Sequence, residues 1–221
     1  LGAAETTRGH LVPARQYYHQ ALLYWRKIGN ASALASTLQS LGVVHHYLGQ
    51  YTEAENRFEE GLSKARDAAD ARIEAYTLAS QGDLYRDTAR PDDALQCYEL
   101  ALQITSRAQN ERLTIYLLDA MSEAYRLKGD LRRARQLLTE ATDLVRADEM
   151  GYELGLCRLS EGALLLAEGN SSLARARLAE ARDLLAACDA RRDLARAHLQ
   201  LAAVAHGEGD DAALRAPMEE V

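Results

Sequence analysis

Small residues recur along this chain at a constant interval of 40 residues. One register holds an alanine in five successive copies, at Ala14, Ala54, Ala94, Ala134 and Ala174. A second register holds a glycine at Gly9, Gly49, Gly129, Gly169 and Gly209, with Ala89 in the remaining copy. Two series with one interval indicate repeated copies of a single structural unit. A unit this short buries too little apolar surface by itself, so the copies must stack on one another.

The composition favours helices over strands. Of the 221 residues, 48% are apolar and only three are proline, which suits long helices joined by short turns. Ala, Leu, Arg and Glu are abundant and are good helix formers, whereas the β-branched and aromatic residues that strands prefer are few. The sequence therefore predicts an all-α protein.

Each unit is expected to form a pair of antiparallel helices. Within residues 31–70, Leu38 and Leu41 lie at helical spacing in the first half, and Phe58 and Leu62 do so in the second. The glycine series falls between the two halves, where glycine tolerates the left-handed conformation that ends a helix. The predicted helices span residues 31–48, 51–68, 71–88, 91–108, 111–128, 131–148, 151–168, 171–188 and 191–207, with a further helix at 11–28 and half-helices at the two ends.

Polar residues with short side chains precede several of these helices. Asn30, Asp70 and Asn110 share one register, and Asp189 lies one place earlier in its own unit. Such side chains accept hydrogen bonds from the free amides at the start of a helix. We therefore expect these four residues to act as N-terminal caps.

A third register explains how the helices of a pair pack. It holds a small residue in the first helix of each unit, at Gly2, Gly42, Gly82, Ser122, Gly162 and Ala202. Large residues recur at the matching register of the second helix, at Tyr18, Phe58, Tyr98, Leu138 and Leu178. Small residues let two backbones approach closely, and the large residues are expected to fill the space around them.

The repeat frame divides the chain into four complete units and two partial ones. The complete units are residues 31–70, 71–110, 111–150 and 151–190, and the partial units are residues 1–30 and 191–221. We expect one continuous solenoid over residues 1–221. The sequence opens at Leu1-Gly2, which matches Leu41-Gly42 in the middle of a helix, so we interpret it as a segment of a larger protein.

The repeated pattern resembles that of the tetratricopeptide repeat (TPR) family. The family pattern places L-G-x2-Y in the first helix and A-x3-F-x2-A in the second. It occurs here as Leu38-x2-Leu41-Gly42-x2-His45 with Ala54-x3-Phe58-x2-Gly61, then as Leu78, Gly82, Tyr85, Ala94, Tyr98 and Ala101, and again as Leu118, Tyr125, Ala134, Leu138 and Ala141. The resemblance covers essentially the whole chain. It implies a right-handed superhelix of antiparallel helix pairs, a TPR-like solenoid.

Two departures from the family pattern concern the length of the unit. It is 40 residues long here, against the family's usual ~34, and the closing proline is absent. Both imply longer helices. Units of this length resemble those in the regulatory solenoids of MalT-like bacterial transcription activators and in the receptor adaptors of cell-polarity complexes.

In solenoids of this kind the first helix of each pair lines a concave groove. The resemblance therefore implies a set of candidate partner-binding residues: Gln39, Val43, His46, Tyr76, Asp83, Arg86, Tyr116, Asp119, Glu123, Arg126, Leu156, Leu159 and Leu166. The middle of the set combines two tyrosines with carboxylates and arginines, which are side chains that anchor peptides. Its last third is leucine-lined, so we expect curvature of the solenoid, further sequence or a partner to cover those leucines.

Two interpretations of the charged groove residues remain open. Either ion pairs form between repeats on a solvated face, or the side chains contact a bound protein segment; the residues concerned are Asp83, Arg86, Glu123 and Arg126.

Two adjacent histidines are expected to differ in exposure. His45 takes the register of Tyr85 and Tyr125 and is expected to be packed, whereas His46 faces the groove.

Charge and composition argue against several classes of partner. The net charge of -7 and the presence of only three lysines argue against a nucleic-acid binder, which needs a basic face. No apolar run approaches the ~20 residues that cross a bilayer. Cys97, Cys157 and Cys188 lie far apart without the spacing of a metal or redox motif, which favours a reducing, cytoplasmic setting.

Nothing in the sequence resembles a catalytic site. We find no Gly-x-Ser-x-Gly turn, no phosphate-binding glycine loop and no carboxylate pair in an apolar pocket. His45 and His46 are adjacent on a helix and point ~100° apart, so they cannot bind one metal ion together. The sequence therefore predicts no enzyme activity, no cofactor and no metal site.

The favoured function is a non-catalytic module that binds a protein or peptide segment in its concave groove. The partner could be another domain of the same full-length protein. The alternative is an effector-sensing regulatory segment of a multidomain bacterial transcription regulator, as the MalT-like resemblance implies. Self-association through the exposed ends of the solenoid is a third hypothesis.

Overall fold

The computed structural model describes residues 1–146 and 149–207, and every regular element in that part of the chain is an α-helix. The chain divides into two compact units, Leu1–Gln109 and Asn110–Val221. The division falls one residue before the predicted junction between the repeats 71–110 and 111–150. The all-α prediction is confirmed, whereas the continuity of the two units as one solenoid stays a prediction.

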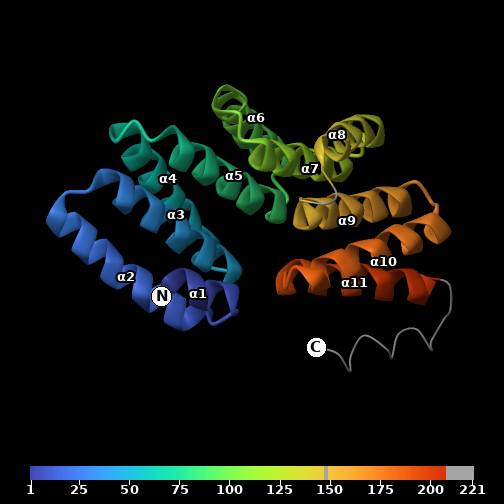
Figure 1. Cartoon of the computed structure of the whole chain (residues 1–221), viewed down its shortest axis with the longest axis horizontal. Helices are drawn as coiled ribbons and strands as arrows, with labels where there is room; N and C mark the ends of the chain where they lie inside the picture. Colours follow the sequence, from blue (N-terminus) through green and yellow to red (C-terminus); the bar gives the residue numbers. More distant parts are fainter. Residues whose placement is uncertain (147–148, 208–221) are drawn as a thin grey trace. The chain divides into compact units, whose positions relative to one another are not determined.

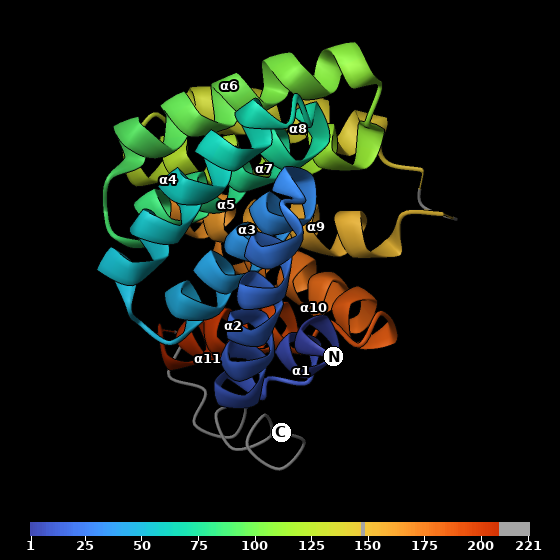
Figure 2. The ribbon, with the colours of Figure 1, turned by 90° about the vertical axis from the view of Figure 1, so that its left-hand side faces the viewer.

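The first unit contains six of the helices in Figure 1. They are α1 (Gly2–Thr7), α2 (Leu11–Ile28), α3 (Ala31–Tyr47), α4 (Tyr51–Asp67), α5 (Ala71–Asp87) and α6 (Pro91–Ala108). Each helix packs on the next one along the chain, and α3 also contacts α5. Figure 2 shows α2, α4 and α6 following one another as the second helices of successive pairs. The first helices of complete pairs in this unit are α3 and α5.

The second unit repeats this arrangement with α7 (Glu111–Leu127), α8 (Leu131–Leu144), α9 (Gly151–Ala167), α10 (Ser171–Ala187) and α11 (Arg191–Gly207). Here α7, α9 and α11 are the first helices of their pairs. The first helix α9 contacts α7 on one side and, less extensively, α11 on the other.

The helix starts agree with the predicted frame, and one helix end does not. We predicted a helix over residues 131–148, but α8 ends at Leu144, and Val145 has an extended backbone with ψ of 124°. The turn that follows differs from the others because Met150 takes the register of Asn30 and Asp70. Met150 is only 2% exposed and makes no side-chain cap, so burial of an apolar residue replaces capping at this junction. The half-helix predicted at the C-terminal end lies outside the described residues.

Three of the four predicted caps are confirmed. The side-chain oxygens of Asn30, Asp70 and Asn110 each accept a hydrogen bond from the backbone amide three residues later, at 3.0, 3.0 and 3.2 Å. The prediction for Asp189 is wrong. Asp189 adopts a left-handed conformation with φ of 51° after the end of α10, and its carboxylate pairs with Arg191 instead of capping α11. A left-handed residue ends one helix and cannot also take the extended backbone of an N-terminal cap.

Glycines in the first helices let a large side chain of the second helix lie directly on the backbone. A Cβ atom built on Gly42 would lie 2.5 Å from the ring of Phe58, and one on Gly82 would lie 2.4 Å from the ring of Tyr98. Both rings are completely buried. The same relation recurs in the second unit, where a Cβ atom on Gly162 would lie 2.5 Å from Leu178. The predicted packing of small against large residues is therefore confirmed.

Replacing Gly82 by alanine tests this contact. The new methyl group cannot fit against the Tyr98 ring without moving one of the helices, so we expect Gly82→Ala to destabilise the protein by about 1–3 kcal/mol. The measurement is chemical denaturation followed by circular dichroism. The matched control is Gly61→Ala in α4, where the nearest atom is the Leu38 Cβ at 3.4 Å and the substitution meets no clash. An equal loss of stability in both variants would contradict the packing argument.

Candidate functional site

The candidate residues lie on the first helices of the pairs, and we call the exposed side of these helices the first-helix face. In the first unit this face belongs to α3 and α5. Gln39 is half-buried and donates a hydrogen bond from Nε2 to the Ser80 Oγ at 2.9 Å. Val43 is half-buried against the cluster that contains Phe58. Tyr76 is 39% exposed, which makes it the most accessible of the candidate residues in this unit.

A connected set of polar side chains joins the C-terminal halves of α3 and α5 to α6. His46 Nε2 lies 3.2 Å from the Asp87 carboxylate, and the Arg86 guanidinium lies 3.0 Å from Asp87 and 3.3 Å from Asp83. The Tyr98 hydroxyl donates a hydrogen bond to Asp83 at 2.8 Å. The predicted residues His46, Asp83 and Arg86 thus contribute to one network, and His46 is more buried than we expected, at 7% exposure.

This network perturbs the acidity of its members. Burial alone would raise the pKa of Asp87, but the hydrogen bond from His46 and the charge of Arg86 outweigh it and hold the pKa well below its ordinary value. Burial, together with the neighbouring Asp83 carboxylate, raises the pKa of Tyr98 well above its ordinary value. Asp87 is therefore ionised and Tyr98 protonated near neutral pH.

In the second unit, leucines that we predicted to line a groove belong to the core. Leu156 is 5% exposed and Leu159 is 1% exposed, and both pack in one cluster with residues of α10 and α11. Tyr116 and Leu166 lie half-buried against the same cluster. Residues this deeply buried are not available to a partner, so the prediction that Leu156 and Leu159 line a groove is replaced by a role in the core. Tyr116 and Leu166 are only half-buried and remain partly accessible.

The charged candidates of the second unit are also largely withdrawn from solvent. Asp119 is 7% exposed and Glu123 is 6% exposed. Arg126 donates hydrogen bonds to both carboxylate oxygens of Glu123, at 3.1 and 3.0 Å. This pair lies within one helix, as does the pair of Asp83 with Arg86 at 3.3 Å. Ion pairs of these residues between repeats stay a prediction.

Polar contacts between consecutive first helices follow a spacing that we did not recognise in the sequence. Four pairs of residues 41 positions apart are in contact: Gln39 with Ser80, His46 with Asp87, Arg112 with Glu153, and Tyr152 with Asp193. The distances are 2.9, 3.2, 2.6 and 3.1 Å. A search for complementary polar residues one repeat plus one position apart would have found Ser80 and Asp87 as partners of the candidate residues.

His45 on α3 is buried next to His19 of α2 and Gln50 at the start of α4, as its register predicted. It is 7% exposed, and its Nδ1 lies 2.7 Å from the Gln50 side-chain oxygen. Its ring meets that of His19 edge-on, with the centroids 6.3 Å apart. Burial, with the nearby His45 and Arg57, lowers the pKa of His19. These histidines therefore belong to the packing between α2, α3 and α4.

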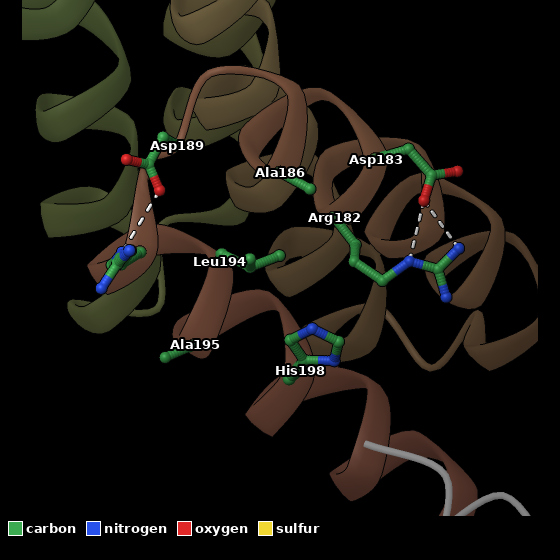
Figure 3. A pocket seen from close by; sticks show the side chains of 8 residues that line it. Arg182, Asp183, Ala186, Asp189, Leu194, Ala195 and His198 are labelled. Atoms are coloured by element: carbon green, nitrogen blue, oxygen red, sulfur yellow. Dashed lines mark hydrogen bonds and ion pairs between the residues drawn. The ribbon is translucent and has the colours of Figure 1, made fainter. Parts of the chain in front are cut away.

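A hollow of about 810 Å³ lies between α10 and α11 in the second unit. Figure 3 shows Leu194 and His198 of α11 facing it together with Arg182 and Asp183 of α10. The Arg182 guanidinium lies 2.7 Å from Asp183, and both side chains are exposed. Exposed pairs of this kind contribute little energy, so the hollow offers no strongly desolvated anchor for a ligand.

The described residues hold neither a cluster of three side chains able to bind a metal ion nor a helix long and apolar enough to cross a bilayer. All three cysteines are free, and Cys97 and Cys157 are buried. Burial raises the pKa of the Cys97 thiol to about 11 and that of Cys157 further, so both thiols are protonated near neutral pH. The cytoplasmic location that the cysteines suggested stays a prediction.

The link between His46 and Asp87 gives a prediction about stability and pH. Because the pKa of Asp87 is lower in the folded protein than the ordinary value of about 3.9, its ionised form stabilises the fold above about pH 4, and this contribution is lost as the pH falls below that value. We expect Asp87→Asn to cost about 1–3 kcal/mol at pH 7 and less at pH 3. Urea denaturation at both pH values measures the difference.

The control for this prediction is Asp67→Asn. Asp67 forms an exposed pair with Lys64 at 2.8 Å, within a single helix, and such pairs contribute ~0.5 kcal/mol or less. A loss for Asp87→Asn that is independent of pH, or no greater than that for Asp67→Asn, would show that the carboxylate charge has no special role.

Comparison with known proteins agrees with this architecture. No curated protein sequence matches the chain significantly. Among solved structures, BtubC (BKLC) from P. vanneervenii superposes with a TM-score of 0.67 at 18% identity, over 93% of this chain and 87% of that one. The TPR-like repeats of a kinesin-light-chain-type protein from Podosopora anserina superpose with a TM-score of 0.63 at 14% identity, over 85% of this chain and 93% of that one. At such identities the likeness concerns the fold alone.

The family assignment rests on the sequence as well as on the fold. The family model for the tetratricopeptide repeat matches residues 1–67 and 74–147, which together make up more than half of the chain. The matched stretches contain the glycine and aromatic registers that hold the helix pairs together. The chain therefore belongs to the tetratricopeptide repeat family.

Proposed function

We propose that this chain is a non-catalytic interaction module that binds a protein or peptide segment on its first-helix face. The observation that carries the proposal is the exposed ring of Tyr76. The neighbouring polar side chains on this face, Gln39 and Ser80, are already hydrogen-bonded within the protein. Tetratricopeptide repeats generally serve as scaffolds for protein–protein interactions, and a rigid surface of this kind needs no chemistry to do so.

The surroundings of Tyr76 favour binding because they are ordered before a partner arrives. The Ser80 hydroxyl donates to the Tyr76 carbonyl oxygen at 3.0 Å and accepts from Gln39 at 2.9 Å, so α3 and α5 are tied together beside the tyrosine. A tyrosine on a rigid helix offers a large contact area and loses little conformational freedom on binding. Tyr76 is therefore the expected anchor in the first unit.

The charged network beside Tyr76 determines which ligand groups the face can accept. Arg86 already lies between Asp83 and Asp87, so its guanidinium is matched by two carboxylates. The two carboxylates outnumber the one guanidinium, so an incoming carboxylate would gain little from Arg86. The first unit is thus suited to a segment with a basic or neutral polar side chain next to an apolar one.

The second unit offers a more apolar face. Tyr116 and Leu166 lie half-buried over the core cluster, and Leu199 on α11 is 71% exposed. Leu166 belongs to α9, which contacts α11. Burying these side chains against an apolar segment would be favourable at roughly 25 cal/mol per Å² of apolar surface. We expect this unit to accept apolar side chains of a partner, which could be another domain of the same full-length protein.

The second candidate function is effector sensing within a larger regulator of the MalT-like bacterial type. The hollow between α10 and α11 is the observation that favours it, because its volume could hold a small molecule. The exposed and mutually paired charges around that hollow make it the weaker candidate. Direct capture of a protein segment requires no such enclosed site.

Peptide selection tests the role of Tyr76. We expect a displayed library of random peptides to yield ligands for the chain, and Tyr76→Ala to weaken the selected peptides by about 1–3 kcal/mol without changing the helical circular dichroism. The control is Tyr51→Ala, because Tyr51 is 47% exposed but lies on α4, a second helix. Unchanged affinity in Tyr76→Ala, or an equal loss in Tyr51→Ala, would refute binding on the first-helix face.

A further inference from the structure

Four side chains that can carry a positive charge lie close together where α2, α3 and α4 pack, and we call them the cationic cluster. They are Arg15 and His19 of α2, His45 of α3 and Arg57 of α4. The ring centroids of His19 and His45 lie 6.3 Å apart. The Gln50 side-chain oxygen lies 2.7 Å from His45 Nδ1 and accepts a hydrogen bond from Arg15 at 3.4 Å. Like charges are thus gathered at one place in a chain whose net charge is -7.

Carboxylates compensate the cationic cluster only in part. Arg57 pairs with Glu60 at 2.8 Å, but Glu60 also binds a second arginine, from α2. Glu53 precedes Arg57 by one turn of α4 and makes no ion pair with the cluster in the described part of the chain. Neither Arg15 nor His19 has a carboxylate partner among the described residues. The Arg57 guanidinium also keeps a buried Nε–H for which the described residues provide no acceptor.

The uncompensated charge is reflected in the acidity of His19. Burial lowers the pKa of His19, and the neighbouring His45, Arg57 and Arg15 lower it further. His19 itself is exposed, and the Arg57 side chain is 32% exposed, so the cluster can be reached from solvent. An anion among these groups would reverse the effect on His19, because a nearby opposite charge favours the protonated imidazole.

The packing of consecutive second helices does not require such a cluster. Forty residues later, between α4 and α6, the positions equivalent to the two residues of α2 and to the arginine of α4 hold Glu55, Glu59 and Cys97. In the second unit, Arg135 and Arg177 take the registers of the two arginines, and each pairs with a glutamate. The arginines between α2 and α4 therefore differ from their equivalents in having fewer carboxylates to neutralise them.

We propose that the cationic cluster binds a phosphate group through Arg15, His19 and Arg57. A guanidinium offers several N–H donors in a fixed plane, and two of them from different helices suit an anion that carries four oxygens. Free phosphate and a phosphorylated side chain of a partner share this chemistry. The site lies on second helices and leaves the first-helix face free, so the inference goes beyond the proposed function. Because the site is partly exposed, free phosphate should bind with a dissociation constant on the order of 1 mM.

Nuclear magnetic resonance of the whole chain at pH 7 tests the site, with inorganic phosphate as the probe. The ring resonances of His19 should shift saturably with phosphate, whereas sodium chloride at equal ionic strength should cause no saturable shift. We expect Arg15→Gln and Arg57→Gln each to weaken binding about tenfold. The matched control is Arg107→Gln, because Arg107 is also exposed on a second helix but lies on α6. Circular dichroism checks that all three variants fold.

The acidity of His19 gives a second measurement, which a purely structural role of the arginines would not change. Sulfate is the probe here, because its charge stays constant over the pH range in which an imidazole titrates. We expect sulfate to raise the pKa of His19 by about 0.5 or more relative to chloride at equal ionic strength. This rise should be lost in Arg57→Gln and kept in Arg107→Gln.

A peptide with one phosphoserine and no other charged side chain distinguishes the two sources of phosphate. Binding at least tenfold tighter than that of inorganic phosphate would identify a phosphorylated partner, and equal or weaker binding would identify the free ion. Shifts that chloride reproduces, equal affinity of Arg57→Gln and Arg107→Gln for phosphate, or a pKa of His19 that sulfate leaves unchanged would overturn the proposal.

Discussion

One packing contact underlies the rest of this structure. A large side chain of the second helix lies on a small residue of the first helix, which is a glycine at Gly42, Gly82 and Gly162. In the first unit, Phe58 and Tyr98 lie on Gly42 and Gly82 at distances that any larger residue would forbid. The contact fixes both the separation and the rotation of the two helices in a pair. Because every residue on a helix follows the rotation of that helix, the same contact decides which side chains reach the first-helix face.

That rotation explains why the face presents few free charges. The network around Arg86 satisfies Asp83, Asp87 and His46 within α3 and α5, and the Tyr98 hydroxyl extends it to the buried ring that holds the pair together. Tyr98 thus belongs both to the packing contact with Gly82 and to the charged network. A partner would meet ordered polar groups that are already paired, so aromatic and apolar contact should supply most of the affinity.

Several features of the fold could be predicted from individual residues, and others could not. The caps at Asn30, Asp70 and Asn110 act within a few residues of their own helix, so local sequence was sufficient to identify them. The early end of α8 and the burial of Met150 depend on neighbouring helices. The contact between His46 and Asp87 joins residues on different helices, and the stacking of α3 on α5 is what brings the two side chains together.

The sequence by itself determined the repeat length, the helix pairs, the small and large residues that pack them, and the family to which the chain belongs, because each of these is encoded by spacing along the chain. Only the tertiary structure decided which candidate residues are accessible. Leu159 and Tyr76 both lie on first helices at registers predicted to face a groove, yet the former is 1% exposed and the latter 39%. The difference arises because exposure depends on what the neighbouring helices place over a residue, and helical periodicity carries no information about those neighbours.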